Sequence, residues 1–339
     1  MRVTALFKRI VLQLVRDKRT LALLFLAPLL ILTLMHLLFT SNEVPSSIGV
    51  IGGSFEIVER LEDQDFEVTV IEETTTLKKL VEEQDLDGIL KIDGEKLQLT
   101  LENTDPSQTK MLQAKLQQVL SLTQDRTSIE MAYVYGNENT SFFDVLSPIL
   151  VGFFVFFFVF LISGIGLLRE RMTGTLERLL STPIKRWEIV MGYLLGYGLF
   201  AVIQTIIVVL YAINVLDMVL KGSMWHVLLI NLLIALVALS LGILLSSFAT
   251  SEFQMIQFIP LVIIPQVFFT GIIPISGMPE WLQMFSNVMP ISYGANALKS
   301  VMYKGQGLGD VQFDILALMG FAVVFIVLNI VALKKHRKI

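Results

Sequence analysis

Six apolar runs dominate the chain, and each is long enough to cross a bilayer about 30 Å thick as a helix. A backbone inside lipid must satisfy its own hydrogen bonds, which an uninterrupted helix does. None of the runs contains Lys or Arg, and Asp314 is their one acidic residue. We therefore predict an integral membrane protein with an all-α six-helix transmembrane domain. The runs are Leu21–Thr40, Val145–Leu168, Met191–Ile213, Met224–Ser247, Gln254–Ile273 and Val311–Leu333.

Composition excludes an ordinary soluble domain. Hydrophobic residues make up 54% of the 339 residues and charged residues 17%, and the mean hydropathy is +0.70. The chain has no cysteine, so it forms no disulfide and carries out no thiol chemistry.

Positive charge gathers in three segments that six spans would place on one side of the membrane. These are residues 1–20, the segment 169–190 and the tail 334–339. Basic residues mark cytoplasmic loops, so we expect cytoplasmic N- and C-termini in a multi-pass protein of the cell membrane, most simply a bacterial one. Residues 41–144 hold 21 acidic residues against eight Lys or Arg and would lie outside.

Residues 41–144 read as a small inserted α+β extracellular domain. The strand-like stretches are SSIGVIG, FEVTVI, DGILKI and KLQLTLEN. Helical patterns are expected at Phe55–Leu61 and Leu77–Glu83, and Asp105 followed by Pro106 predicts the start of a longer helix. The alternative is a solvated spacer, although Ser/Gly runs are absent.

Residues 1–20, ahead of the first transmembrane helix at 21–40, predict an amphipathic cytoplasmic helix. Val3, Phe7, Ile10 and Leu14 recur at helical spacing, whereas Arg9 lies off this stripe. Such a helix suits the membrane interface. The alternative is a charged leader that only sets topology.

The segment 169–190 lies between the second and third spans. Gly174 offers a break, and the neighbouring threonine hydroxyls of Thr173 and Thr175 are expected to cap the helix that follows. Leu176, Leu179 and Leu180 then form a small apolar surface. These leucines would fit a groove on a soluble partner, or the helix would rest on lipid.

The stretch RERMTGTLERLLSTPIKRWEIVMGY, residues 169–193, resembles the cytoplasmic signature of the type-2 ABC exporter permeases. A second stretch, WLQMFSNVMPISYGANALK, resembles the outward segment of the same family. Departures from the family pattern are Met172, Met289 and Lys299. The resemblance covers nearly the whole chain, including the domain inserted after the first span.

The resemblance implies that residues 174–183 form a coupling helix seated on a separate ATPase subunit. The chain has no G-x-x-x-x-G-K-[ST] motif, so two copies of that partner would bind ATP and Mg, and this chain would be neither an enzyme nor a holder of cofactors or metals. A second permease chain and membrane lipid are the other expected partners, with no nucleic acid. The expected coupling residues are Glu170, Gly174, Thr175, Leu176, Glu177, Leu179, Leu180, Thr182, Pro183 and Glu188.

The remainder of the transmembrane domain, residues 145–333, would hold the transport route. The resemblance implies that the second and fifth spans line it, and an apolar cavity with a few amides suits a hydrophobic or amphipathic cargo, such as a drug, antibiotic or lipid. The phenylalanines could instead face lipid or pack in the core. The expected path residues are Phe154, Phe157, Phe158, Gln257, Gln266 and Thr270.

Residues 274–303 contain too many prolines and glycines for another full span. By resemblance they form a re-entrant outward segment and exit gate. The expected gate residues are Pro274, Trp281, Pro290 and Tyr293.

The leading function is therefore the membrane subunit of an ATP-driven exporter. One alternative is a membrane receptor or scaffold built on the outer domain. Another is an exporter of polysaccharide or ions. Ionisable side chains are sparse in the spans, which argues against transport driven by an ion gradient.

Overall fold

The computed structural model describes residues 2–38, 47–52, 67–71, 88–93, 96–101, 129–136, 140, 142–272 and 278–333. The chain divides into two compact units. Residues 1–36 and 146–339 form the first, which is helical, and residues 37–145 form the second, which contains a β-sheet.

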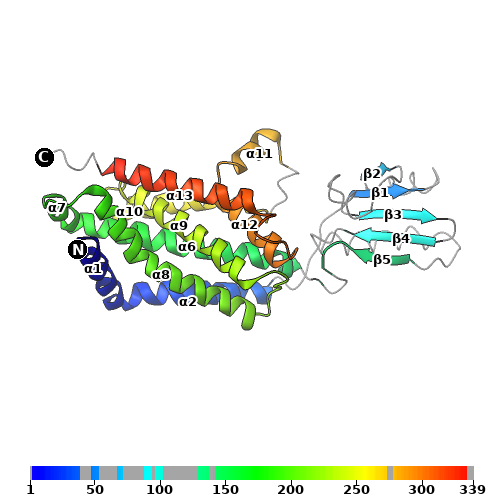
Figure 1. Cartoon of the computed structure of the whole chain (residues 1–339), viewed down its shortest axis with the longest axis horizontal. Coiled ribbons are helices and arrows are strands. Elements are labelled where there is room, and N and C mark those ends of the chain that lie inside the picture. The colour runs from blue at the N-terminus through cyan, green and yellow to red at the C-terminus, as the bar shows by residue number, and fades with distance from the viewer. Residues whose placement is uncertain are drawn as a thin grey trace. The chain divides into compact units, whose positions relative to one another are not determined.

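The helical unit is a bundle with its short connections at two ends (Figure 1). Helices α1 and α7 lie at one end of the bundle, where α13 also finishes, and α12 lies toward the other. The helices are α1 (Arg2–Arg16), α2 (Lys18–Leu38), α6 (Phe142–Met172), α7 (Thr175–Leu180), α8 (Arg186–Asn214), α9 (Met224–Ser246), α10 (Glu252–Phe268), α11 (Glu280–Ser286), α12 (Pro290–Met302) and α13 (Gln312–Ala332).

Within the described residues, five helices are long and apolar enough to cross a membrane: α2, α6, α8, α9 and α13. Helix α10 has 17 residues, which is about 26 Å at 1.5 Å per residue. It contains Pro260 and Pro265 and is followed by a turn at Gly271, whose φ is +86°. The helix continues past both prolines and ends at Phe268, so it stops short of the end of the predicted run Gln254–Ile273. A sixth span therefore stays a prediction.

Helix α9 lies at the centre of the bundle. It packs against α8, α12 and α13, and its Asn231 and Ser240 are completely buried. The Asn329 amide of α13 donates to the Ser240 carbonyl at 2.8 Å. A buried amide in an apolar bundle needs such a partner, and this bond fixes α13 against α9.

Helix α1 packs along α8. Its buried residues Leu6, Ile10 and Leu14 recur every four positions. A Cβ at Gly192 would lie 2.8 Å from the Leu6 Cβ, and one at Gly196 would lie 2.7 Å from the Ile10 Cγ2. The two glycines therefore allow a backbone approach that larger residues would prevent. A helix within the predicted range 1–20 is confirmed, but it ends at Arg16, and Leu6, Ile10 and Leu14 are buried in the bundle. Its place at the membrane interface stays a prediction.

The second unit contains a five-stranded mixed sheet in the order β2-β1-β3-β4-β5. β1 pairs in parallel with β2 and β3, β3 pairs antiparallel with β4, and β4 pairs in parallel with β5. Val50, Ile89, Leu90, Leu99 and Leu101 are fully buried. The strands are β1 (Ser47–Ile51), β2 (Glu67–Val70), β3 (Gly88–Asp93), β4 (Lys96–Leu101) and β5 (Ile129–Tyr133).

The four predicted strands are confirmed, whereas β5 was not predicted. Its sequence IEMAY is short, and only its pairing with β4 makes it a strand. The helices predicted at Phe55–Leu61, Leu77–Glu83 and after Asp105 lie outside the described residues. So does the tail 334–339.

Candidate functional site

The candidate site is the turn from α6 through α7 into α8. Gly174 joins the first two helices with φ +68°, and a Cβ there would meet no atom within 4 Å. The left-handed conformation, not a lack of space, therefore favours glycine. The predicted role of Thr173 was wrong: its hydroxyl donates to the Arg169 carbonyl at 3.0 Å and caps the end of α6, not the start of α7.

The leucines of α7 do not form an exposed anchor. Leu176 is 2% exposed and Leu180 is 8% exposed, and both line a small cavity together with Leu168 and Ala249. Leu179 is half-buried. The expectation that Leu176 and Leu180 fill a groove on a partner is therefore corrected: burying them holds α7 against the bundle, because exposing two leucines costs several kcal/mol.

The outer face of α7 and the turn after it are polar. Glu177, Arg178, Ser181, Thr182 and Pro183 are exposed. The Thr182 hydroxyl donates to the Leu179 carbonyl at 2.7 Å, which closes the turn. This face presents one acid, one base and two hydroxyls to a partner. The buried leucines lie on the opposite side of α7 and pack in the bundle.

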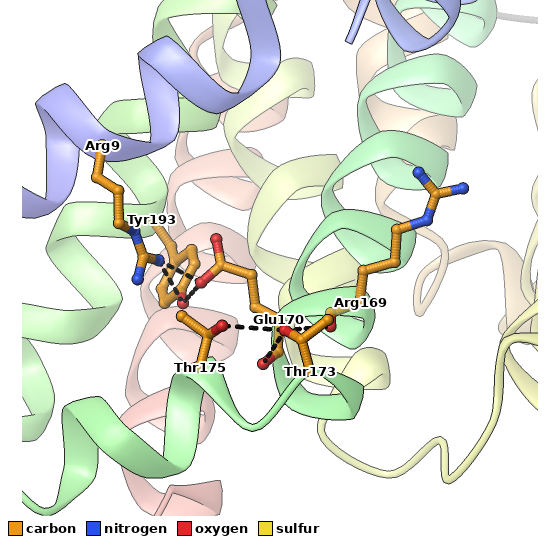
Figure 2. Close-up of polar contacts among 6 residues, drawn as sticks. All are labelled: Arg9, Arg169, Glu170, Thr173, Thr175 and Tyr193. Atoms are coloured by element: carbon orange, nitrogen blue, oxygen red, sulfur yellow. Dashed lines mark hydrogen bonds and ion pairs between the residues drawn. The ribbon is translucent and has the colours of Figure 1, made fainter. Parts of the chain in front are cut away.

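Glu170 is the most buried charged side chain of this region, with 3% of the side chain exposed. It forms an ion pair with Arg9 of α1 and accepts a hydrogen bond from the Tyr193 hydroxyl of α8 (Figure 2). Arg9 also donates to the Tyr193 hydroxyl at 3.3 Å. Three helices therefore meet at one carboxylate, which lies five residues before α7.

Arg169 points away from this cluster (Figure 2) and contacts two other carboxylates. Its guanidinium lies 3.6 Å from Asp17, between α1 and α2, and 3.2 Å from Glu252, at the start of α10. Asp17 caps α2 by accepting from the Thr20 hydroxyl and amide at 2.6 and 3.1 Å. These bonds, assisted by Arg169, hold the pKa of the Asp17 carboxyl below its usual value.

Glu188 stabilises the start of α8, after α7. Its carboxylate accepts from the Lys185 amide at 2.7 Å, which caps α8. The Arg2 guanidinium of α1 lies 3.7 Å from the same carboxylate and donates to the Pro183 carbonyl. Helix α1 is thus attached to both ends of the segment that carries α7.

The expected path residues differ in how far they are buried. Phe154 and Phe158 are buried in the core of this chain, whereas Phe157 is half-buried and Gln257 is exposed. The side-chain oxygen Oε1 of Gln266 accepts from the Ile291 backbone amide at 3.1 Å and so joins α10 to α12. Thr270 is buried and donates to the Val267 carbonyl at 2.7 Å. Four of the six therefore have packing roles within this chain.

Two of the expected gate residues, Pro290 and Tyr293, lie in the first turn of α12. Pro290 is buried at the first position of α12, and the Tyr293 hydroxyl donates to the Asn287 carbonyl at 3.0 Å. Trp281 of α11 is 63% exposed. Pro274 lies outside the described residues. Beside Tyr293 is a cavity of about 260 Å³ with Asp314 in its wall, whose carboxylate accepts from the Asn296 amide at 3.0 Å.

The sequence did not identify Arg9 or Tyr193 as partners of Glu170. Arg9 stands among other basic residues near the N-terminus, where a lipid contact was the simpler interpretation. The available signal was Glu170 itself, because a carboxylate at the end of an apolar helix needs a cation when it is buried. Among the described residues, no cluster of His, Asp and Glu could hold a metal ion.

Comparisons with known proteins agree with this architecture. Residues 18–331 match the family described as ABC-2 family transporter protein. The chain is similar to ABC transporter G family member 20 of Dictyostelium discoideum, with 29% identity over 208 residues, which are 60% of this chain and 28% of that protein. It is also similar to the inner membrane transport permease YhhJ of Escherichia coli, with 30% identity over 176 residues, 51% of this chain and 47% of that protein.

A further relative is the probable multidrug ABC transporter permease YbhR of Escherichia coli, with 25% identity over 173 residues, 51% of this chain and 47% of that protein. The chain thus aligns with less than half the length of each of these relatives.

Proposed function

The chain belongs to the ABC-2 family of transporter proteins, and we propose that it is the membrane subunit of an exporter driven by a separate ATPase. Two permease chains and two ATPase subunits would form the complex. ATP would close the ATPase pair, and the attached helices would change access from one side of the membrane to the other.

Helix α7 carries the proposal. It is a short polar-faced helix between two long apolar ones, and its leucines are buried within the bundle. Lipid alone would favour the opposite arrangement, with the leucines turned outward. The exposed Glu177 and Arg178 therefore suit a soluble protein, whose charged groups would set the register of docking.

The link from α7 to the rest of the molecule supports coupling. A force on α7 passes directly to α6 and α8, and the Glu170 and Glu188 contacts carry it to α1. These contacts lie on one end of the bundle together with most of the basic residues. We assign that end to the cytoplasm by the preference of Lys and Arg for cytoplasmic loops, and the acidic unit 37–145 to the outside.

Helix α10 would be the sixth span. Glu252 at its start contacts Arg169 near α7, and Gln266 near its end contacts α12. It therefore runs from one end of the bundle to the other. The preceding helix α9 ends near Arg171, which donates to the Ala249 carbonyl at 2.8 Å.

For the cargo we propose a hydrophobic or amphipathic compound. The spans offer apolar and aromatic surface with few charges, and one relative's name, probable multidrug ABC transporter permease YbhR, points the same way. Phe157 and Gln257 are the expected path residues that stay accessible for such a compound.

The test is co-purification of the chain with its ATPase, found by mass spectrometry as a protein with the G-x-x-x-x-G-K-[ST] motif. Reversing the charge with Arg178→Glu should lower ATPase recovery at least tenfold and abolish transport, with normal amounts of folded permease. Lys8→Glu is the matched control, because Lys8 is exposed on α1 at the same end of the bundle.

Equal ATPase recovery from both variants would contradict docking at α7. Failure to recover any ATPase with the unaltered chain would favour a receptor or scaffold. Leu176→Asp is unsuitable here, because it buries a carboxylate within the chain and destabilises the bundle itself.

A further inference from the structure

A cavity of about 250 Å³ opens between the α1–α2 corner and helices α6 and α8. It is separate from the outer face of α7 and from the expected path residues. One part of its wall is apolar, with Leu23 from α2 and Leu161, Ile162 and Ile165 from α6. Leu161 and Ile165 are one helical turn apart, so they form a continuous surface along the axis of α6.

The other part of its wall is charged. Arg19 and Arg169 both line it, together with Asp17. Arg19 is exposed and forms no ion pair with any described residue, whereas Asp17 already accepts two hydrogen bonds from Thr20. Arg16 and Lys18 lie beside this rim in sequence, so its surroundings are strongly positive.

Tyr197 supplies an independent observation. It is 4% exposed and lines the same cavity, where its hydroxyl lies against Gly166. No hydrogen bond joins this hydroxyl to the described part of the chain, although the neighbouring Tyr193 hydroxyl has two such partners. The Tyr197 side chain is therefore held in place by packing, while its hydroxyl is left to donate to an acceptor inside the cavity.

We propose that this cavity binds one phosphate-bearing membrane lipid. Its phosphate lies on Arg19, because a free guanidinium binds phosphate with paired hydrogen bonds. Arg169, which already contacts Asp17 and Glu252, adds positive charge at the same wall. The ester or phosphate oxygens accept from the Tyr197 hydroxyl. One acyl chain begins along Leu23, Leu161 and Ile165. The cavity holds only the phosphate and the start of this chain, so the remainder of the lipid lies in the bilayer.

The position of α2 supports a lipid at this place. Little of α2 is buried. Its buried leucines are Leu24 and Leu32, and near its far end the Thr33 and Tyr211 hydroxyls lie 2.7 Å apart. At the near end, Asp17 caps the helix and the cavity separates α2 from α6. The lipid would fill that space and hold α2 against the bundle.

The test measures lipid retained by the chain purified in detergent, using native mass spectrometry after addition of phosphatidylglycerol. The unaltered chain should keep one lipid, and Arg19→Gln should reduce its occupancy at least fivefold. Arg16→Gln is the matched control, because Arg16 is exposed on the same corner but does not line the cavity. Both substitutions are on the surface, so folding is preserved.

Two further arms separate the sources of phosphate. Inorganic phosphate at millimolar concentration should not displace the lipid, because it lacks an acyl chain. Leu161→Trp should lower lipid retention by blocking the apolar wall while leaving Arg19 intact. Equal retention by Arg19→Gln and Arg16→Gln would overturn the proposal. Displacement of the lipid by inorganic phosphate would also overturn it, because the site would then bind phosphate alone and not the acyl chain.

Discussion

Two adjacent residues, Arg169 and Glu170, have different roles because successive positions on a helix point about 100° apart. Glu170 faces the bundle and pairs with Arg9, whereas Arg169 faces outward and bridges Asp17 and Glu252. How far each side chain is buried decides how much its ion pair contributes to the free energy of unfolding. An exposed ion pair contributes about 0–1 kcal/mol, but a buried charge that loses its partner is much more costly.

Glu170→Gln should destabilise the chain by about 2 kcal/mol, because it leaves the Arg9 charge without its carboxylate. The value is below that for a fully buried pair, since the Arg9 side chain is 33% exposed. Thermal unfolding in detergent measures the loss. Arg169→Gln is the control and should cost less than 1 kcal/mol, as its side chain is 52% exposed.

Combining Glu170→Gln with Arg9→Gln should cost less than the sum of the single substitutions, because the double variant buries no unpaired charge. Additive losses would show that the two side chains do not interact.

Gly174→Ala should destabilise the α6–α7 turn by about 1 kcal/mol, because an L side chain is disfavoured at φ +68°. Thermal unfolding and proteolysis of the turn would measure this. Gly309→Ala is a matched control, since a Cβ at Gly309 also meets no atom within 4 Å, without a positive φ. Equal effects at both positions would argue against a conformational role for Gly174.

At the scale of elements, α1 is attached to the bundle by two kinds of contact. Leu6 and Ile10 pack on the glycines of α8, and Arg2 and Arg9 pair with the two glutamates that flank α7. The apolar contacts set how close the helices come, and the ion pairs set their register. Helix α1 should therefore move together with α7 and not as an independent anchor.

Gly196→Val should displace α1, because its Cβ would lie 2.7 Å from the Ile10 Cγ2. Overpacking of this kind costs about 1–3 kcal/mol. Amide hydrogen exchange in α1 should accelerate while exchange in α9 stays slow. Gly198→Val is the control, because a Cβ there would make an ordinary 3.6 Å contact with Leu239. Unchanged exchange in α1 would mean that Ile10 can move aside.

For the whole molecule, the number of membrane crossings depends on whether α10 spans the membrane. If α10 crosses, Thr182 after α7 and Gly309 before α13 lie on opposite sides. If it does not, they lie on the same side. The absence of cysteine makes this measurable with single introduced thiols.

We expect Gly309→Cys and Thr104→Cys to react with an impermeant thiol reagent in intact cells, and Thr182→Cys to react only after the membrane is opened. Labelling of Thr182→Cys in intact cells would reverse the orientation. Protection of both Thr182→Cys and Gly309→Cys would reduce the spans to five and leave α10 on the cytoplasmic side.

The sequence by itself determined the membrane class, five of the long helices, helix α1, the existence of α7 and four of the five strands. These features depend on local order: an apolar run long enough for a bilayer, leucines spaced for one helical face, or alternating residues in a strand. The family signature in residues 169–193 also lies within one continuous stretch.

Only the tertiary structure decided which side of each helix is covered. The periodicity of Leu176 and Leu180 is the same whether they face a partner or their own bundle, and only their burial within this chain shows that they are internal. Likewise, Arg9 and Glu170 are 161 residues apart. Their pairing depends on packing α1 against α8, which no local pattern encodes, because burial and charge pairing arise only when distant segments meet.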